Sequence, residues 1–242
     1  YNLSTPTIIQ GNRYMDATLY TGTGATNNIV NAAKFKPDFV WGKDRGQAQG
    51  HLLFDSVRGV YNFLASNSTD AEGTNNQTLT AFNSNGYTLG TNGTLNQSSQ
   101  SFVGWQWQAG QGTTSSGTGT GGITSVTQSV NTTAGFSIVT YTGSGTAGTV
   151  THGLGVAPSF YIVKRRNAAG DYWCCYHVSI GATKGIYLNT TDTAGVSDLW
   201  NNTAPTSSVF SVKTTTGVNA SGGTYVAYCF AEIAGFSKFG SY

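Results

Sequence analysis

Charged side chains are scarce in this chain of 242 residues, of which Asp, Glu, Lys and Arg make up 9%. Soluble domains with many helices usually carry about a quarter of their residues as charges, which keep the helix surfaces hydrated. Here Gly, Thr, Ser and Asn separate short runs of Val, Ile, Phe, Tyr and Trp. This composition is typical of strands and turns, and the aromatic content of 12% argues against a disordered chain.

Long hydrophobic runs and long basic runs are also missing. The segment YVAYCFAEIAGF is interrupted by Glu232 and is too short to cross a bilayer, so membrane insertion is not expected. The net charge is +2 and the densest basic run is 164–166, so we expect no nucleic-acid partner. The chain starts at Tyr1 without a signal-like segment, and we expect it to be a fragment of a longer protein.

Cysteine is rare, and its positions do not suggest a metal site. Cys174 and Cys175 are neighbours, so on a strand they point to opposite faces and do not easily share one ligand sphere. We expect them and Cys229 to pack as small hydrophobic residues. A disulfide between Cys229 and either of the other two stays open, and it would need an oxidising environment. No metal or cofactor is expected.

Two parts of the chain repeat each other at a constant spacing. KPDFVWGKDR at 36–45 returns as APSFYIVKRR at 157–166, and LYTGTG at 19–24 returns as TYTGSG at 140–145, in both cases 121 residues later. Further downstream, SFVGWQWQAG resembles TYVAYCFAEIAG with a spacing that has shifted by a few residues. Because loops tolerate insertions better than strands, this pattern predicts the duplication of one β domain.

The repeat divides the chain into four predicted parts. Residues 1–14 would link to a preceding domain, 15–110 form the first repeat, 111–134 form a Gly/Thr/Ser-rich linker, and 135–242 form the second repeat. The segment ITSVTQSV at the end of the linker could be an extra strand.

Short strands separated by turn residues predict an all-β fold: two tandem homologous antiparallel β-sandwich domains of a jelly-roll-like kind. In the last strand of the first repeat, Val103, Trp105 and Trp107 alternate with smaller residues, and in the second repeat the same alternation places Val226, Tyr228 and Phe230 on one face. We expect this bulky face of each strand to form the core. Gly104 and Ala227 on the other face suggest that another sheet or chain approaches closely, with a glycine bulge as the alternative. The strands predicted for the first repeat are 17–22, 27–32, 37–44, 51–55, 61–66, 78–89 as a hairpin, and 101–109.

The motifs LYTGTG, HGLGVAPSF and YVAYCFAEIAGFSKFGSY resemble an uncharacterised repeat domain of tail-fibre-like virion proteins of tailed phages, especially marine phages, which follows SPRY-like domains. The resemblance implies an outward-facing structural protein of a virion, in a tail or capsid fibre. It implies other virion proteins as partners. Because such a fibre must cover its exposed strand edges, we expect self-association as a homotrimer or another homo-oligomer. The family brings no catalytic or binding residues. The first repeat has VNAAKFKP where the second has THGLGVAP, so a role for His152 cannot be transferred to Asn31.

Two kinds of side chain are candidates for contact with a host glycan. Alternate basic residues of equivalent strands would share one face and attract acidic sugars or lipopolysaccharide, although a solvated strand face is the simpler explanation and the preferred one. Tryptophans that are not matched between the repeats would favour a carbohydrate-binding module. These candidates are Lys43, Arg45, Lys164, Arg166, Trp173 and Trp200.

An enzyme would need polar groups that converge on a substrate. Glu72 and Glu232 are the only glutamates, and neither is repeated, so a polysaccharide depolymerase is the less favoured alternative and we expect no enzymatic activity. His51 and His177 could recruit a metal or act as a base, but ordinary hydrogen bonds at strand ends are the preferred interpretation. Asp55 and Arg58 are expected to form a local ion pair that braces a turn.

Asn-X-Ser/Thr sequons are abundant, as expected in a chain rich in these residues. They would imply a glycosylated surface only in a eukaryotic source. The sequons begin at Asn2, Asn67, Asn76, Asn92, Asn96, Asn131, Asn189, Asn201 and Asn219.

Overall fold

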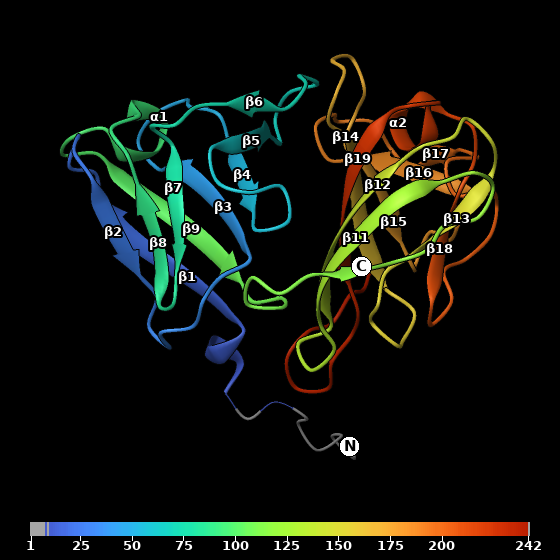
Figure 1. The fold of residues 1–242 in the computed structure, drawn as a ribbon, viewed down its shortest axis with the longest axis horizontal. Coiled ribbons are helices and arrows are strands. Elements are labelled where there is room, and N and C mark those ends of the chain that lie inside the picture. The colour runs from blue at the N-terminus through green and yellow to red at the C-terminus, as the bar shows by residue number, and fades with distance from the viewer. Residues whose placement is uncertain (1–7, 9, 242) are drawn as a thin grey trace. The chain divides into compact units, whose positions relative to one another are not determined.

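The computed structural model describes residue 8 and residues 10–241, and every strand pair in this part of the chain is antiparallel (Figure 1). The chain forms two compact units. The N-terminal unit comprises Gln10–Ser68 and Glu72–Thr113, and the C-terminal unit comprises Thr114–Tyr242 with Thr69–Ala71. The linker predicted over 1–14 lies mostly outside the described residues, as does the sequon at Asn2.

The N-terminal unit contains a six-stranded sheet in the order β1-β9-β3-β4-β5-β6 and a three-stranded sheet in the order β2-β8-β7. β1, β2 and β3 alternate between the sheets, as in a jelly roll, whereas β3 to β6 form a meander within one sheet. The strands are β1 (Met15–Thr21), β2 (Asn27–Val30), β3 (Phe39–Asp44), β4 (Leu52–Asp55), β5 (Asn62–Ala65), β6 (Gly73–Thr74), β7 (Leu79–Asn83), β8 (Gly86–Leu89) and β9 (Ser101–Trp107).

The core of this unit lies between its two sheets. Val40 and Phe54 of the larger sheet pack in one cluster with Ile29 and Tyr87 of the smaller sheet. Leu95 of the short helix α1 (Gly93–Asn96) closes the same cluster. A one-turn 3-10 helix, η1 (Gly11–Arg13), precedes β1.

The C-terminal unit contains an eight-stranded sheet in the order β10-β11-β12-β19-β14-β15-β16-β17 and a two-stranded sheet of β13 and β18. A second short helix, α2 (Thr216–Asn219), precedes the last strand. The strands are β10 (Ser115–Ser116), β11 (Thr124–Asn131), β12 (Phe136–Thr142), β13 (Gly148–Thr151), β14 (Phe160–Arg165), β15 (Cys174–His177), β16 (Lys184–Tyr187), β17 (Gly195–Val196), β18 (Val209–Val212) and β19 (Thr224–Phe230).

The core of the C-terminal unit again lies between the two sheets. Val150 and Phe210 of the smaller sheet pack in one cluster with Tyr161, Tyr225 and Ala227 of the larger sheet. None of the helices in the described part of the chain is long and apolar enough to span a membrane.

The all-β prediction is confirmed, and the strands expected in the first repeat are present with boundaries that differ by a few residues. The segment predicted as a linker over 111–134 contains β10 and β11, so the extra strand suggested by ITSVTQSV is real. β11 pairs with β12, with Ser129 opposite Ile138. Although β11 is mostly polar, its successive side chains point to opposite faces of the sheet, and Val126 is buried on one of these faces.

The face of β9 that forms the core was predicted wrongly. Phe102, Gly104 and Gln106 face the smaller sheet, while Trp105 and Trp107 lie on the opposite face and are half-buried. A Cβ atom at position 104 would overlap the Tyr87 hydroxyl, so a large residue of β8 occupies the space that glycine leaves. The expected close approach of another sheet at Gly104 is therefore confirmed.

In β19 the same correction applies, because Tyr225, Ala227 and Cys229 belong to the cluster between the sheets. Val226 and Tyr228, which were expected to form the core face, point to the other side of the strand. The two faces of β19 are both apolar and buried, so size alone was a poor guide to the core.

Candidate functional site

The two tryptophans predicted to contact a glycan are buried. Trp173 and Trp200 are both 0% exposed, and the Trp200 ring stands edge-on to Tyr161 with 4.8 Å between ring centroids. They fill the core because an indole buries more apolar area than other side chains. The exposed aromatic side chains among the described residues include Tyr61 and Tyr172, and Tyr172 packs against Tyr187.

The predicted basic patch is also divided. Lys164 is 0% exposed and donates to the Asp171 carbonyl at 3.0 Å, so it braces the loop after β14. Lys43 is half-buried and donates to the Gln47 carbonyl at 2.8 Å, which braces the loop after β3. The arginines differ as well: Arg45 is exposed and Arg166 is half-buried. The repeated lysines therefore hold loops, and they do not form a shared charged surface.

A buried asparagine at the end of each short helix explains the repeated TG motif, which is the segment LYTGTG at 19–24 and TYTGSG at 140–145. In the C-terminal unit, Asn219 Oδ1 accepts from the Ser144 amide at 2.8 Å. Its Nδ2 donates to the carbonyls of Thr146 and Lys213, at 2.7 and 2.6 Å. The side chain is 0% exposed and ties the loop after β12 to the segment before α2.

Asn96 does the same in the N-terminal unit. Its Oδ1 accepts from the Thr23 amide at 2.9 Å, and its Nδ2 donates to the carbonyls of Ala25 and Gly90. Sequence reasoning noted Asn96 and Asn219 only as sequons. Because both are 0% exposed and fully engaged, neither can accept a glycan in the folded protein.

The tyrosine of the same motif makes a further repeated contact. Tyr20 Oη donates to the Leu95 carbonyl at 2.9 Å, and Tyr141 Oη donates to the Val218 carbonyl at 2.6 Å. Burial raises the pKa of both phenols, so they stay protonated as donors. Both rings stack on the last strand: Tyr20 on Phe102 at 5.3 Å and Tyr141 on Tyr225 at 5.0 Å between centroids.

His152 and Asn31, which differ between the repeats, share a structural role. The Leu154 amide donates to His152 Nδ1 at 3.2 Å, and the Phe35 amide donates to Asn31 Oδ1 at 2.9 Å. Both side chains are buried and hold the loop that follows them. His152 Nε2 lies 3.1 Å from the Thr206 carbonyl, so the neutral tautomer with a proton on Nε2 satisfies both contacts.

We expect the free energy of unfolding to fall as the pH drops below about 6.5, the ordinary pKa of histidine. Burial lowers the pKa of His152 in the folded state, so protonation favours the unfolded state; the pKa of His51 is lowered in the same direction, mainly by burial. In His152→Asn, we expect the melting temperature to depend less on pH between 7.5 and 5, as measured by circular dichroism. An equally steep dependence in this variant would contradict the assignment.

The other residues considered for chemistry have structural contacts. His51 Nδ1 accepts from Trp41 Nε1 at 3.3 Å, and His177 Nδ1 accepts from the Ser179 amide at 3.1 Å. Among the residues described, no group of three or more His, Cys, Asp or Glu side chains could hold a metal. The cysteines are free buried thiols, which agrees with packing as small hydrophobic residues; burial raises the pKa of Cys175 and Cys229 to about 12.

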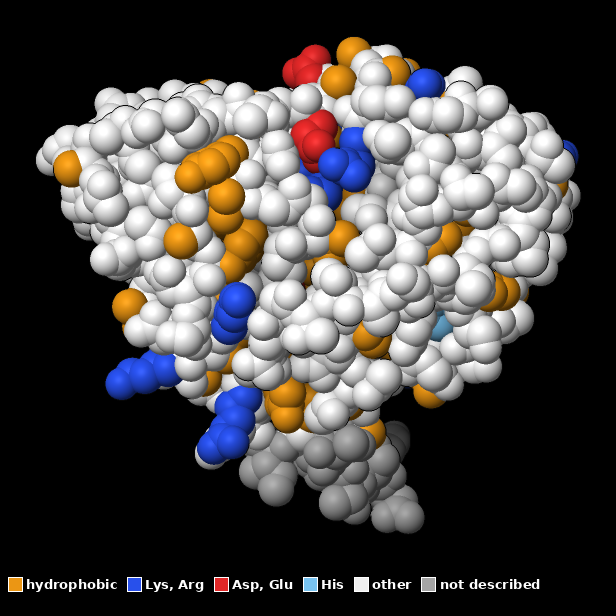
Figure 2. Space-filling model, viewed as in Figure 1, with side chains coloured by type: hydrophobic (Ala, Val, Ile, Leu, Met, Phe, Trp, Pro, Cys, Tyr) orange, Lys and Arg blue, Asp and Glu red, His pale blue; other side chains and the backbone are white. Residues whose placement is uncertain are grey.

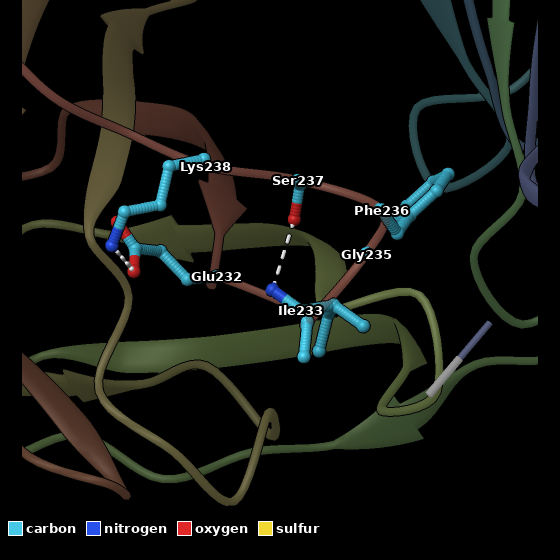
Figure 3. Close-up of a pocket in the computed structure, with 7 residues that line it drawn as sticks. Glu232, Ile233, Gly235, Phe236, Ser237 and Lys238 are labelled. Carbon is cyan, nitrogen blue, oxygen red and sulfur yellow. Dashed lines mark hydrogen bonds and ion pairs between the residues drawn. The ribbon is translucent and has the colours of Figure 1, made fainter. Parts of the chain in front are cut away.

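Each glutamate is engaged by a basic side chain of its own unit. Glu232 forms an ion pair with Lys238 at 2.6 Å at one side of an open pocket of about 540 Å³ in the C-terminal loop (Figure 3). The Lys238 contact lowers the pKa of Glu232, whereas a general acid needs a raised pKa. Glu72 binds Arg58 at 2.8 Å. The expected ion pair between Arg58 and Asp55 is confirmed, and both side chains are fully buried.

A cleft of about 340 Å³ at one end of the N-terminal unit was missed by the sequence analysis. It is formed by segments far apart in the chain: η1, the loop before β3, and the residues after β9. Basic side chains gather at this end of the unit, at the lower left of Figure 2, on a surface that is otherwise mostly uncharged. Its lining includes Arg13, Tyr14, Lys34, Phe35, Gln108 and Gln111.

Buried polar groups fix both walls of this cleft. The Asp38 carboxylate, 0% exposed, accepts from the amides of Ala109, Gln111 and Gly112 at 2.6 to 2.8 Å. On the other side, Asn31 exchanges hydrogen bonds with the backbone of Phe35. The walls are therefore in place before a ligand binds, so the protein loses less conformational entropy on binding.

The same end of the C-terminal unit has a different lining. The Gln108 amide donates to the Tyr14 carbonyl at 2.8 Å, and the Ala231 amide donates to the Gly135 carbonyl at 2.8 Å, so these positions correspond. At the constant spacing of 121, Arg13 and Lys34 correspond to alanine and glycine, at 134 and 155. The basic lining is thus specific to one unit.

Fold and contacts define a protein of two antiparallel β-sandwich units whose repeated polar residues hold loops. Residues 10–242 match the family described as Domain of unknown function (DUF7483), and the chain belongs to this family. No curated protein and no solved structure shows a significant match.

Proposed function

We propose that this chain is a non-enzymatic structural and adhesion component of a phage virion, built from two copies of one β-sandwich domain. The observation that carries the proposal is the duplicated set of contacts around Asn96 and Asn219. Residues shared by the two units hold loops in the same way in each, as expected when a stable module is copied to extend a fibre. Such copies multiply weak contacts through avidity.

The strand order of the two units supports their origin from one domain. Each main sheet contains the same series of six strands, and each smaller sheet contains an equivalent pair. The N-terminal unit adds β7, and the C-terminal unit adds β10 and β11. The corresponding elements are β1 and β12, β9 and β19, β3 and β14, β4 and β15, β5 and β16, β6 and β17, β2 and β13, β8 and β18, and α1 and α2.

On the strength of the resemblance to tail-fibre-like repeats, the proposed location is the outside of the virion, in a tail or capsid fibre. Its partners are other virion proteins and further copies of the same chain, in a homotrimer or another homo-oligomer. Charged side chains are few on the face shown in Figure 2, and the chain is rich in Thr, Ser and Asn, which suits such close assembly.

The proposal is tested on purified particles of a phage that encodes the chain. We expect mass spectrometry to find the protein in the particles at a constant copy number, and immunogold labelling to place it on fibres. Lysate proteins of similar abundance are the control for contaminants that remain with the particles during purification. Absence of the chain from washed particles would contradict the proposal.

The second candidate is a carbohydrate-binding module, which the preformed basic cleft of the N-terminal unit favours. In this function the binding residues would be those of the cleft and not the buried Trp173 and Trp200. Loss of glycan binding in alanine variants of these tryptophans would report unfolding, because each fills the core.

A further inference from the structure

We infer that the basic cleft of the N-terminal unit binds an acidic saccharide, with Arg13 and Lys34 holding a carboxylate of the sugar. The inference specifies the ligand of the adhesive role proposed above and rests on it for its biological meaning. Three observations carry it: the charge of the cleft, the chemistry of its other side chains, and its backbone.

The charge of the cleft is positive where a ligand would enter. Arg13 and Lys34 are exposed, and the Lys36 ammonium lies beside Gly112 on the same side of the unit. The nearby carboxylate of Asp38 is buried and receives three backbone N–H groups and the Ser56 hydroxyl. Its charge is therefore satisfied within the protein, and the guanidinium and ammonium are the groups offered to an anion.

The remaining lining suits a sugar better than a bare anion. Gln111 is exposed and carries an amide, which can donate to and accept from neighbouring hydroxyl groups of a sugar. Tyr14 adds an aromatic ring and a hydroxyl, which suit the mixed polar and apolar surface of a pyranose. The volume of about 340 Å³ lies at the lower end of the range for small-ligand sites, which suits one or two sugar rings.

The backbone of the cleft departs from ordinary conformations at two positions. Lys34 has φ of 57° and Gln111 has φ of 55°, both in the left-handed region that favours glycine. The position corresponding to Lys34 in the C-terminal unit is Gly155, also with positive φ. A lysine in the left-handed region strains the backbone more than a glycine does, and backbone strain of this kind is concentrated at functional sites.

The test measures binding of an acidic oligosaccharide by isothermal titration calorimetry with the full chain. The probes are oligogalacturonate, a hyaluronate fragment, the methyl ester of each of these two, and inorganic phosphate. We expect at least one acidic oligosaccharide to bind, with its neutral form at least tenfold weaker. Binding of neither acidic probe, equal binding of ester and acid, or equally tight binding of phosphate would overturn the inference.

Two variants locate the site. Lys34→Asn, with a residue that tolerates a left-handed backbone, and Arg13→Gln should each weaken binding about tenfold, the loss of one charge-assisted contact. Lys184→Asn removes an exposed charge from the C-terminal unit and should bind as the natural protein does. Equal weakening in Lys34→Asn and Lys184→Asn would mean that only net charge matters. Melting temperatures confirm that each variant is folded.

The two proposals can fail separately. A chain that is present in particles but does not bind acidic sugars would leave the virion role intact and remove this ligand. A chain that binds acidic sugars through Arg13 and Lys34 but is absent from particles would do the reverse.

Discussion

Replacing Arg58 by alanine is expected to lower the free energy of unfolding by about 3–5 kcal/mol. The Arg58 side chain is fully buried, and its guanidinium contacts Asp55, Glu72 and the Leu53 carbonyl. Without it, the Asp55 carboxylate remains in the interior, where an unpaired charge is costly. Urea unfolding followed by tryptophan fluorescence measures the loss.

A surface ion pair gives the matched control for this variant. Lys213 and Asp198 are 2.6 Å apart, but their side chains are 37% and 47% exposed. Lys213→Ala should therefore cost less than about 1 kcal/mol. The double variant Arg58→Met, Asp55→Asn should recover part of the loss, since the Asp55 carboxylate then no longer stays in the interior without the Arg58 cation. An Arg58→Ala variant as stable as Lys213→Ala would show that water reaches Asp55.

Replacing Asn219 by alanine is expected to cost about 3 kcal/mol, because several buried backbone groups lose their partners at about 1–3 kcal/mol each. The affected groups are the Ser144 amide and the carbonyls of Thr146 and Lys213. The loop after β12 should also loosen, which hydrogen exchange at the amides of 144–146 would detect.

The variant Asn96→Ala tests whether the hydrogen bonds of Asn96 stabilise the N-terminal unit as much as those of Asn219 stabilise the C-terminal unit. Asn96→Ala should destabilise the N-terminal unit by a similar amount, if the units are copies of one domain. Asn76→Ala, at an exposed sequon asparagine, should stay within about 0.5 kcal/mol of the natural protein. If all three variants have the same stability, the buried asparagines do not hold the loops.

Sequence reasoning found the strands because a period of two is a local property of the backbone. It failed to choose the inner face of β9, since that choice depends on Tyr87 of another sheet, which fills the space over Gly104. The buried asparagines left a weaker signal. Asn96 and Asn219 recur at a shifted spacing, just before the last strand of each unit, and both were read as sequons.

The amino-acid sequence by itself determined that this protein is all-β and located the strands of the first repeat to within a few residues, and it shows one pattern of strands and TG loops twice. Only the tertiary structure decided which side chains are available to a partner. Trp173, Trp200 and Lys164 are buried in the folded chain. The Trp200 ring packs on Tyr161 of β14, and the Lys164 ammonium bonds to the Asp171 carbonyl. The cleft of Arg13, Lys34 and Gln111 exists because three segments separated along the chain end at the same place. Burial and convergence depend on contacts between distant residues, which a local pattern does not contain.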